Sequence, residues 1–530
     1  MFPGSLYSPQ HTGARRLAYA GMAVLTGLTA SFGNALVTVN APSLAGPLGL
    51  YSAQLAWLPA IYIAFNATAN LSLVKARTQF GVPRVTAVLL VAYALAAGLQ
   101  LAWPTFAVAA LTRAAAGMAA AALATMTVYG FLQAFPAKVR PLALIFGISL
   151  SQLGPVLARM TPVELVVADH GRGLHLMELG VALAALAVTT VVRLPPSDRS
   201  RVFERLDFLT IGLTIPGMLL LCGVLSLGRV LWWTDTPWLG WALAGAIPLL
   251  MAVAVIEHYR ARPLLQTRWI GTVDMMRFAA VAVLVRVALA EQTYGSVGLL
   301  TSGGLNNDQL RTLFAVVGGA MALGMVVAAL TLSERRIPYQ VLAAAAIIGI
   351  AAWLDSHANN LTRPGQLYLS QAMIGFGTTL FLGPAMLYGF QRMVARGGDH
   401  LVTFVVVFSM TQNLGGLAGS ALLGTYQTIA ARAHAAALSE HVNAFDPQVA
   451  ARIQAGASSL SGVVVDPLAR GVQGGGLLGQ AIAREANILA FNDTFRLVAL
   501  LALLTVVYVA YIIVFNTIRR RRAAAAEPAA

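Results

Sequence analysis

The sequence predicts an all-α protein that crosses a membrane fourteen times, with both termini in the cytoplasm. Hydrophobic residues make up 58% of the 530 positions and charged residues only 10%, which is too little charge for a soluble protein of this size. Between Arg16 and Lys75 the chain runs 58 residues without a charged side chain. That length is enough for two crossings of about 20 apolar residues each. Basic residues are also concentrated on one predicted face.

The apolar tracts predict helices, because backbone polar groups cannot stay unpaired in lipid. A Pro/Gly cluster at 41–49 separates the first tract from the second, and such clusters end helices. The first tract is long and is followed directly by another, so it is not a cleavable signal peptide. The spans are expected at 17–39, 53–73, 85–103, 106–130, 141–162, 174–192, 208–228, 236–256, 278–300, 312–333, 337–354, 365–391, 401–424 and 497–516.

The basic residues set the predicted orientation. With fourteen spans, 22 basic residues fall on one face and four in the short loops of the other. This asymmetry places the richer face in the cytoplasm. An odd number of spans would put the run 519–522 outside, so an even number is favoured. The net charge of +15 therefore reflects topology and gives no reason to expect nucleic-acid binding.

Several chemistries are excluded by what the sequence lacks. The single cysteine, Cys222, allows no disulfide within the chain. The eight histidines show no paired metal-ligand spacing, and there is no phosphate-binding loop. We expect neither a metal nor a cofactor, and no enzyme activity, since no nucleophile–base pair appears. Active transport would have to use an ion gradient.

Two pairs of segments indicate an internal duplication. Residues 112–117 resemble 370–375 at an offset of 258, and 153–158 resemble 414–419 at an offset of 261. A duplicated six-span unit is a common plan for transporters. The predicted divisions are a first six-helix bundle, an inserted helix pair with linkers, a second six-helix bundle in two segments, an outer loop and an Arg-rich cytoplasmic tail, at 1–200, 201–270, 271–424 with 491–518, 425–490 and 519–530.

The outer loop is predicted to contain helices at 426–441 and 446–455 and a third at 478–489, with flexible turns at 458–462 and 471–476. It is expected either to form a structured cap or to dock a periplasmic partner.

These features resemble the major facilitator superfamily, specifically its fourteen-span drug:proton antiporter branch (EmrB/QacA-type). The resemblance covers the whole chain. It rests on Gln54 and Trp57 followed by Tyr62, Arg113 with Gly117, Gly147 with Gly154 and Pro155, Gly415 with Gly416, and Asn492 with Asp493. The resemblance implies that Gly117, Gly147, Gly154, Pro155, Gly415 and Gly416 form conformational motifs, with the Gly154–Pro155 kink at the contact between the halves.

The departures from the family pattern concern acidic residues. The acid of the family's first span falls on Gly33, and the acidic position of its cytoplasmic loop motif falls on Thr78. Proton coupling through the usual first-span carboxylate is therefore not expected. Arg113, without that acid, is predicted to present positive charge to a central cavity; the alternative is a structural arginine bonded to backbone carbonyls.

Three other intramembrane charges are candidates for proton coupling: Glu291, Glu178 and Arg286. Glu291 is the first choice, because low dielectric favours the protonated form of a carboxylic acid. Arg286 lies five residues earlier, about 140° around the helix, so the two do not form an i,i+4 pair. The alternative for Glu291 is a position near the outer mouth, paired with an arginine. Glu178 is expected at the membrane interface.

The family geometry implies a substrate cavity lined by Arg113, Asn34, Trp57, Tyr62, Phe65 and Gln371, although such aromatics also serve as packing. The sequence thus predicts a bacterial inner-membrane exporter of amphipathic, aromatic or anionic small molecules, driven by protons through alternating access. It could pass cargo to a periplasmic adaptor and an outer-membrane channel. An uncoupled facilitator and a non-transporting receptor or scaffold are the alternatives.

Overall fold

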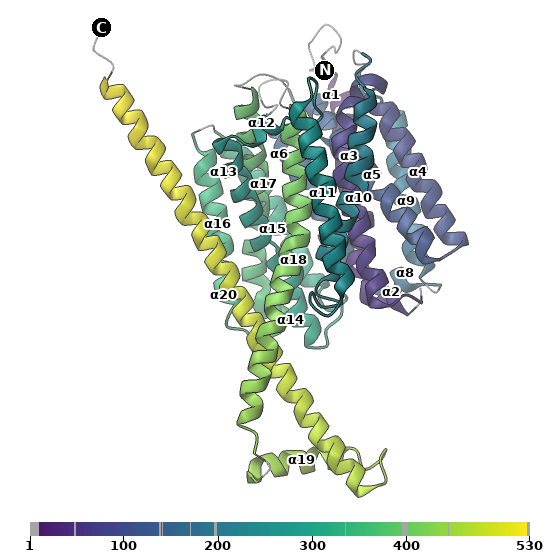
Figure 1. Ribbon diagram of the computed structural model, residues 1–530, viewed down its shortest axis with the longest axis vertical. Helices are drawn as coiled ribbons and strands as arrows, with labels where there is room; N and C mark the ends of the chain where they lie inside the picture. Colours follow the sequence, from purple (N-terminus) through teal and green to yellow (C-terminus); the bar gives the residue numbers. More distant parts are fainter. Residues whose placement is uncertain are drawn as a thin grey trace.

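The computed structural model describes residues 10–46, 49–136, 139, 141–169, 171–195, 199–333, 335–394, 401–443 and 445–526, and this part of the chain is helical (Figure 1). The helices of the first half are α1 (Gly13–Val39), α2 (Ala41–Ala45), α3 (Ser52–Phe80), α4 (Val82–Ala102), α5 (Phe106–Ala134), α6 (Pro141–Ser149), η2 (Leu150–Gln152), α7 (Leu153–Met160), α8 (Val163–Val167) and α9 (Arg172–Val191).

The remaining helices are α10 (Arg205–Leu227), α11 (Pro237–Tyr259), α12 (Thr267–Ile270), α13 (Val273–Ala288), η3 (Glu291–Ser296), α14 (Val297–Ser302), α15 (Arg311–Leu330), α16 (Ile337–Asp355), η4 (Pro364–Leu367), α17 (Tyr368–Val394), α18 (Leu401–Glu440), α19 (Pro447–Ser459) and α20 (Pro467–Ala526). Within the described residues, eleven helices are long and apolar enough to cross a membrane. The other three predicted spans coincide with α3, with the run from α13 to α14, and with α18.

The chain is therefore a multi-pass membrane protein, and fourteen remains the span count that the sequence predicts. Figure 1 shows that α1 begins and α20 ends toward the same end of the bundle. We call this the inner end, in line with the predicted orientation, and the opposite end the outer end.

Small residues set how closely the helices pack. A Cβ atom on Gly117 of α5 would collide with the backbone carbonyl of Tyr62 on α3. On the other side of the molecule, a Cβ on Gly375 of α17 would lie 3.1 Å from the backbone oxygen of Val317 on α15. Glycines at such points let backbones approach, which is how membrane helices associate without a hydrophobic driving force.

The fifth predicted span is broken in its middle. The turn η2 separates α6 from α7, and Pro155 stands in the first turn of α7. Proline cannot donate to the carbonyl four residues earlier, which belongs to Ser151. The hydroxyl of Ser31 on α1 donates to that carbonyl instead. A Cβ on Gly154 would overlap Ser31, so this glycine allows α1 to reach the break.

The inserted pair packs outside the two halves. Helix α10 contacts both α3 and α18. Met218 and Cys222 of α10 pack against alanines of α3 and against Met410 and Leu414 of α18. Helix α11 lies against α10 (Figure 1). The pair therefore covers one of the seams between the halves.

A buried charge cluster fixes the inner end of this pair. Lys75 of α3 and Arg260 contact Asp207 of α10 at 2.8 and 2.7 Å, and Arg260 also contacts Glu204 at 2.8 Å and Glu257 at 3.1 Å. The hydrogen bond from Arg260 lowers the pKa of Glu204, which lies just before α10. A buried charge is stable only when it is paired and hydrogen-bonded, and here three carboxylates share two cations.

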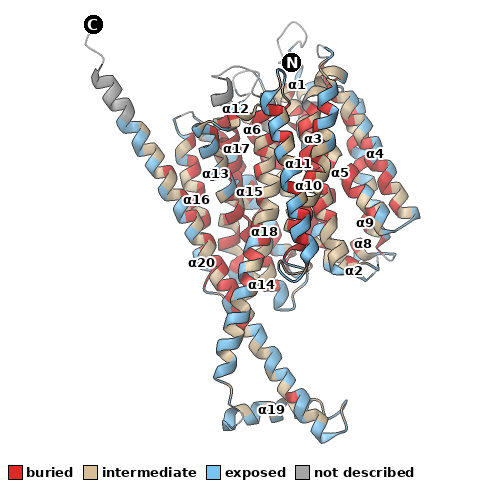
Figure 2. Ribbon diagram, viewed as in Figure 1, coloured by how far each residue is buried: buried red, intermediate tan, exposed pale blue. Residues whose placement is uncertain are grey.

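Beyond the outer end, α18 and α20 continue past the bundle and are joined by α19 (Figure 1). None of the residues of α19 is buried (Figure 2). The predicted helix at 446–455 corresponds to α19, whose N-terminus is capped by Asp446. The turn predicted at 471–476 is wrong, because these residues are helical within α20. Helix α19 packs closely on Gly474 of α20. A Cβ atom at position 474 would lie only 2.9 Å from the backbone nitrogen of Ala457 on α19.

Candidate functional site

A buried ion pair lies in the first half. Arg113 of α5 is 2% exposed and Glu178 of α9 is fully buried. Arg113 Nη2 pairs with Glu178 Oε1, and Nη1 donates to the carbonyl of Gly33 at 3.3 Å. Tyr93 Oη of α4 donates to the same carboxylate at 3.3 Å. A charge inside a membrane is costly unless it is paired, and this arrangement neutralises both partners.

One sequence prediction is corrected here. Arg113 does not present uncompensated charge to a central cavity, because Glu178 neutralises it inside the first half. Glu178 lies in the second turn of α9, on the side that faces α1 and α4, and its depth in the membrane stays a prediction. A Cβ at Gly33 would collide with Tyr93 Oη. An acid at position 33 would displace that tyrosine, so the carboxylate comes from α9 instead.

Unpaired polar atoms adjoin this ion pair. His175 Nδ1 lies 3.7 Å from Glu178 Oε2. Within the described part of the chain, both ring nitrogens of His175, Glu178 Oε2 and Gln100 Oε1 lack a hydrogen-bond partner. They border a cavity of about 10 Å³, which is room for about one water molecule.

A second polar cluster occupies the other half. Glu291, at the start of η3, is fully buried, and Asp355, at the end of α16, is 2% exposed. Gln371 Nε2 of α17 donates to Asp355 Oδ2 at 2.7 Å and lies 3.1 Å from Glu291 Oε1. The same amide nitrogen therefore brings the two carboxyl groups together. No basic side chain of the described residues contacts either of them.

The chemistry of this carboxyl pair follows from its burial. Two negative charges held close together repel strongly where water does not screen them, so burial favours a state in which at least one of the two groups is neutral. Gln371 Nε2 lies within hydrogen-bond distance of both oxygens of Glu291 and of Asp355 Oδ2. The segment η3 is π-helical, a local widening that is frequent at functional sites. It sets the direction in which Glu291 leaves the helix.

The two clusters stand at matching positions of the predicted duplication. Gln371 follows Arg113 by 258 residues, and Glu291 follows Gly33 by the same 258. The side chain of the fourth span therefore contacts the first span in one half, and that of the twelfth contacts the ninth in the other. The acid that the family pattern places in the first span stands at the matching position of the second half. Arginine and glycine are replaced there by glutamine and glutamate.

Glu291 forms an ion pair with neither Arg286 nor Arg113. The Nε atom of Arg286 donates to the carbonyl of Gln412 on α18 at 3.0 Å. Its guanidinium lies over the glycine pair of α18, 2.7 Å from where a Cβ of Gly416 would stand, while its Cγ faces Gly415 at 3.1 Å. Among the described residues it contacts no carboxylate, and both amide atoms of Gln412 lack a partner. An unneutralised cation therefore stands beside α18.

Polar contacts join the halves at two places. Asn413 Nδ2 of α18 donates to Asn66 Oδ1 of α3 at 2.7 Å, and Asn70 donates to Ser409 Oγ at 3.0 Å. We call this group the α3–α18 seam. It runs alongside Arg286, since Gln412 and Asn413 are neighbours.

At the outer end, Arg159 of α7 donates to Asn307 Oδ1 at 2.9 Å, and Asn307 donates to Asn40 Oδ1 at 2.9 Å. The Arg159 guanidinium also stacks 5.1 Å from the ring centre of Phe314 on α15. We call this the outer latch. At the inner end, α6 packs on α17, where a Cβ of Gly383 would stand 2.7 Å from Ile145. Helix α6, which precedes the Gly154–Pro155 kink, thus packs on α17, and α7, which contains the kink, packs on α15.

Several predicted cavity residues serve as packing instead. Trp57 faces α10, 2.5 Å from where a Cβ of Gly223 would stand. Tyr62 is buried and donates to the carbonyl of Ala30 at 2.9 Å. Gln371 is 1% exposed within the carboxyl cluster. Asn34 and Phe65 are half-buried. Gly147 is a packing position, since its Cβ would lie 2.8 Å from Val128.

Asp355, His175, Tyr93 and Asn307 were not identified from the sequence. Asp355 directly follows the apolar run of α16, and an acid in that position is the signal that could have marked it. The others are common residue types whose role depends on what they touch.

The fold is similar to that of solved membrane transporters. The human organic anion transporter MFSD10 (TETRAN) superposes with a TM-score of 0.53 at 13% identity, covering 93% of this chain and all of that one. The major facilitator proton:xylose symporter XylE superposes with a TM-score of 0.52 at 13% identity, covering 92% and 95%. No family model matches the sequence, and no curated protein sequence matches it. At 13% identity the likeness shows the fold alone.

Proposed function

We propose that this chain is a proton-coupled secondary transporter of a bacterial inner membrane, which exports amphipathic small molecules by alternating access. It would belong to the fourteen-span drug:proton antiporter branch. The fold supports transport in general. The observation that carries proton coupling is the buried pair of Glu291 and Asp355 with Gln371 between them.

The proton site would work through a change in hydration. The pair is buried and has no cationic partner among the described residues, and in this proposal it holds a proton while it is buried. When the halves separate and water reaches the site, hydration lowers the free energy of the charged form of a carboxyl group, and the proton leaves. A site that binds protons in one state and releases them in another couples a gradient to movement.

Alternating access requires contacts that can open at each end. The outer latch and the packing of α6 on α17 lie at opposite ends of the bundle and join the same two halves. Opening one while the other stays closed would rock the halves about the α3–α18 seam. Polar seams suit such motion, because their hydrogen bonds can be exchanged for bonds to water at modest net cost.

The substrate is proposed to be anionic or aromatic, and Arg286 replaces Arg113 as the group that would attract it. Arg113 is neutralised by Glu178, whereas Arg286 contacts no described carboxylate and lies beside unpaired Gln412. A guanidinium can hold a carboxylate through two parallel hydrogen bonds.

The test is transport in proteoliposomes with an imposed pH gradient. Glu291→Gln and Asp355→Asn each imitate the protonated state. They should abolish pH-driven accumulation of an anionic aromatic probe while leaving exchange down its own gradient. Thr293→Ser, in the same π-helical segment, is the matched control. Arg286→Gln should weaken uptake of anionic probes more than that of neutral ones.

Unchanged pH-driven accumulation in both carboxyl variants would favour the uncoupled facilitator, and no exchange of any probe by the wild type would favour a receptor or scaffold. The projection formed by α18, α19 and α20 supports the proposal of a periplasmic adaptor leading to an outer-membrane channel. Deleting residues 441–466 should then abolish export from intact cells but not transport in proteoliposomes.

A further inference from the structure

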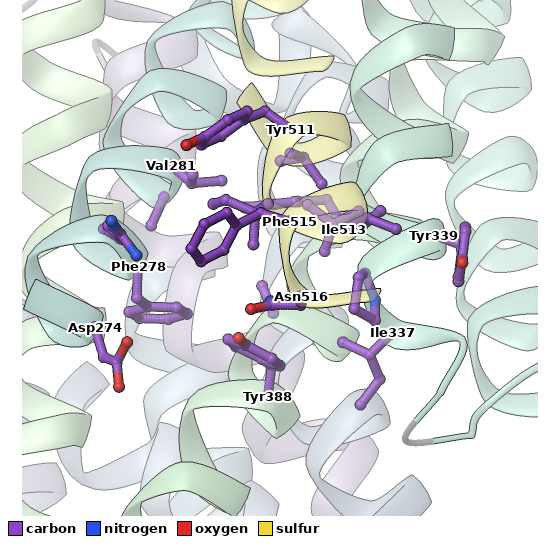
Figure 3. A pocket seen from close by; sticks show the side chains of 18 of the residues that line it. Asp274, Phe278, Val281, Ile337, Tyr339, Tyr388, Tyr511, Ile513, Phe515 and Asn516 are labelled. Atoms are coloured by element: carbon purple, nitrogen blue, oxygen red, sulfur yellow. The ribbon is translucent and has the colours of Figure 1, made fainter. Parts of the chain in front are cut away.

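A cavity of about 440 Å³ opens in the inner half of the second bundle, away from the seams between the halves. Helices α13, α16, α17 and α20 line it, together with Arg335 just before α16. Figure 3 shows Phe278, Phe515 and Tyr388 around a common space. The volume falls within the roughly 300–1,000 Å³ typical of small-ligand sites.

The lining changes from polar to apolar with depth. Its polar residues lie near the predicted membrane surface. Arg277 is in the second turn of α13, Arg335 lies just before α16, and Asn516 and Thr517 stand where the predicted last span (497–516) ends. One to two turns deeper, the walls are aliphatic and aromatic. Asn516 and Val509 are seven residues apart on α20, which is about 10 Å along a helix. A ligand that fits has one polar end and an apolar body.

The polar end is cationic. Arg277 and Arg335 are exposed, and in the described part of the chain neither contacts a carboxylate. Asp274 shares the rim, so two guanidiniums and one acid leave a net positive charge. Phosphate is a natural partner for such a rim, because guanidinium binds it in a forked geometry.

The position of the cavity decides the source of the ligand. No described residue of the first half lines it, so it does not lie on a path between the halves. It lies where the inner part of α20 leaves the bundle (Figure 1). Leu504, Val507 and Tyr511 on that part of α20 are more than half exposed, as expected for a helix in contact with lipid. The cavity therefore faces the membrane's inner leaflet.

We propose that this cavity binds an anionic phospholipid, with its phosphate at Arg277 and Arg335 and an acyl chain among Phe278, Val281, Phe381 and Ile513. The occupant would lie one side chain away from the inner contact between the halves. Ile337 and Tyr388 line the cavity and also pack on Leu144 of α6. Binding there would support the closed inner end.

The experiment uses the full-length protein in detergent, with bound lipid measured by native mass spectrometry during titration with phosphatidylglycerol or phosphatidylcholine. Wild type should retain phosphatidylglycerol preferentially. Each rim arginine near an anionic head group is worth about a fivefold change in affinity, so Arg277→Gln with Arg335→Gln should weaken binding about 25-fold. Arg336→Gln is the matched control, because this neighbouring exposed arginine does not line the cavity.

Ala385→Phe places a larger side chain in the apolar part of the cavity. It should lower the retention of both lipids while Arg277 and Arg335 stay unchanged. The proposal is overturned if Arg335→Gln and Arg336→Gln act equally, which would indicate general surface attraction, or if phosphatidylcholine binds as well as phosphatidylglycerol. Glycerol phosphate alone should not compete with the lipid. If it competes fully, the rim is an anion site without a lipid.

Discussion

Removing the carboxylate of Glu178 tests the buried ion pair of the first half. Glu178→Gln keeps the shape of the side chain but leaves the guanidinium of Arg113 unpaired at 2% exposure. The guanidinium then keeps only neutral acceptors, the carbonyl of Gly33 and the amide oxygen of the new glutamine. Removing one member of a buried pair costs about 3–5 kcal/mol, because the other charge stays buried without compensation.

An exposed pair in the same region provides the control. The side chains of Arg172 and Asp169 are 54% and 64% exposed and lie 3.2 Å apart, at the N-terminus of the helix that carries Glu178. Pairs of this kind contribute about 0–1 kcal/mol. Arg172→Gln should therefore change stability little, while Glu178→Gln should lower it severalfold more.

The assay is thermal unfolding of the purified full-length protein, followed by a second substitution. An unfolding entropy of about 2.1 cal/mol/K per residue predicts that Glu178→Gln lowers the Tm by about 3 °C or more. Arg113→Met with Glu178→Gln should recover much of this loss, since no buried charge remains. The reasoning is refuted if Glu178→Gln and Arg172→Gln have the same Tm. It is also refuted if the double variant is less stable than Glu178→Gln alone.

Three further predictions concern other parts of the molecule. Arg159→Gln should open the outer latch, seen as faster labelling of a Val156→Cys probe by a membrane-impermeant maleimide; equal labelling rates would exclude a latch. Gly474→Val should separate α19 from α20 and speed proteolysis of the projection without changing the Tm of the bundle, and an unchanged digestion rate would count against this packing. Because the hydrogen bond from Arg260 lowers the pKa of Glu204, this contact should stabilise the protein above the ordinary glutamate pKa and be lost as the pH falls through the lowered value. Glu204→Gln should reduce the loss of Tm on acidification, and an identical pH profile in this variant would contradict that.

The positions of the helices could be predicted from the sequence because lipid leaves the backbone no alternative. The first span was expected at 17–39 and α1 covers 13–39, and the eleventh was expected at 337–354 where α16 covers 337–355. The duplication stays a prediction, based on an offset of 258 that links Arg113 to Gln371. Local signals of this kind depend on composition and spacing alone.

Long helices were harder to delimit. Apolar patterns mark the part of a helix that lies in lipid, but α20 runs 60 residues and continues well beyond it. The glycines within 471–476 led to the prediction of a turn there. In the structure, Gly474 lets α19 pack on α20, and that contact keeps the segment helical.

The partners of the buried charges were decided by the tertiary structure alone. Helix periodicity gives the face on which a residue stands, but not which face of another helix meets it or at what depth. Arg113 could be predicted as an unusual charge, yet its neutralisation by Glu178 depends on how α5 and α9 pack around α1. Glu291 could be chosen as a protonatable acid, yet its partner Asp355 is 64 residues away in sequence and meets it only because Gln371 stands between them. Contacts between distant spans determine the charge state of these groups, and no single span encodes them.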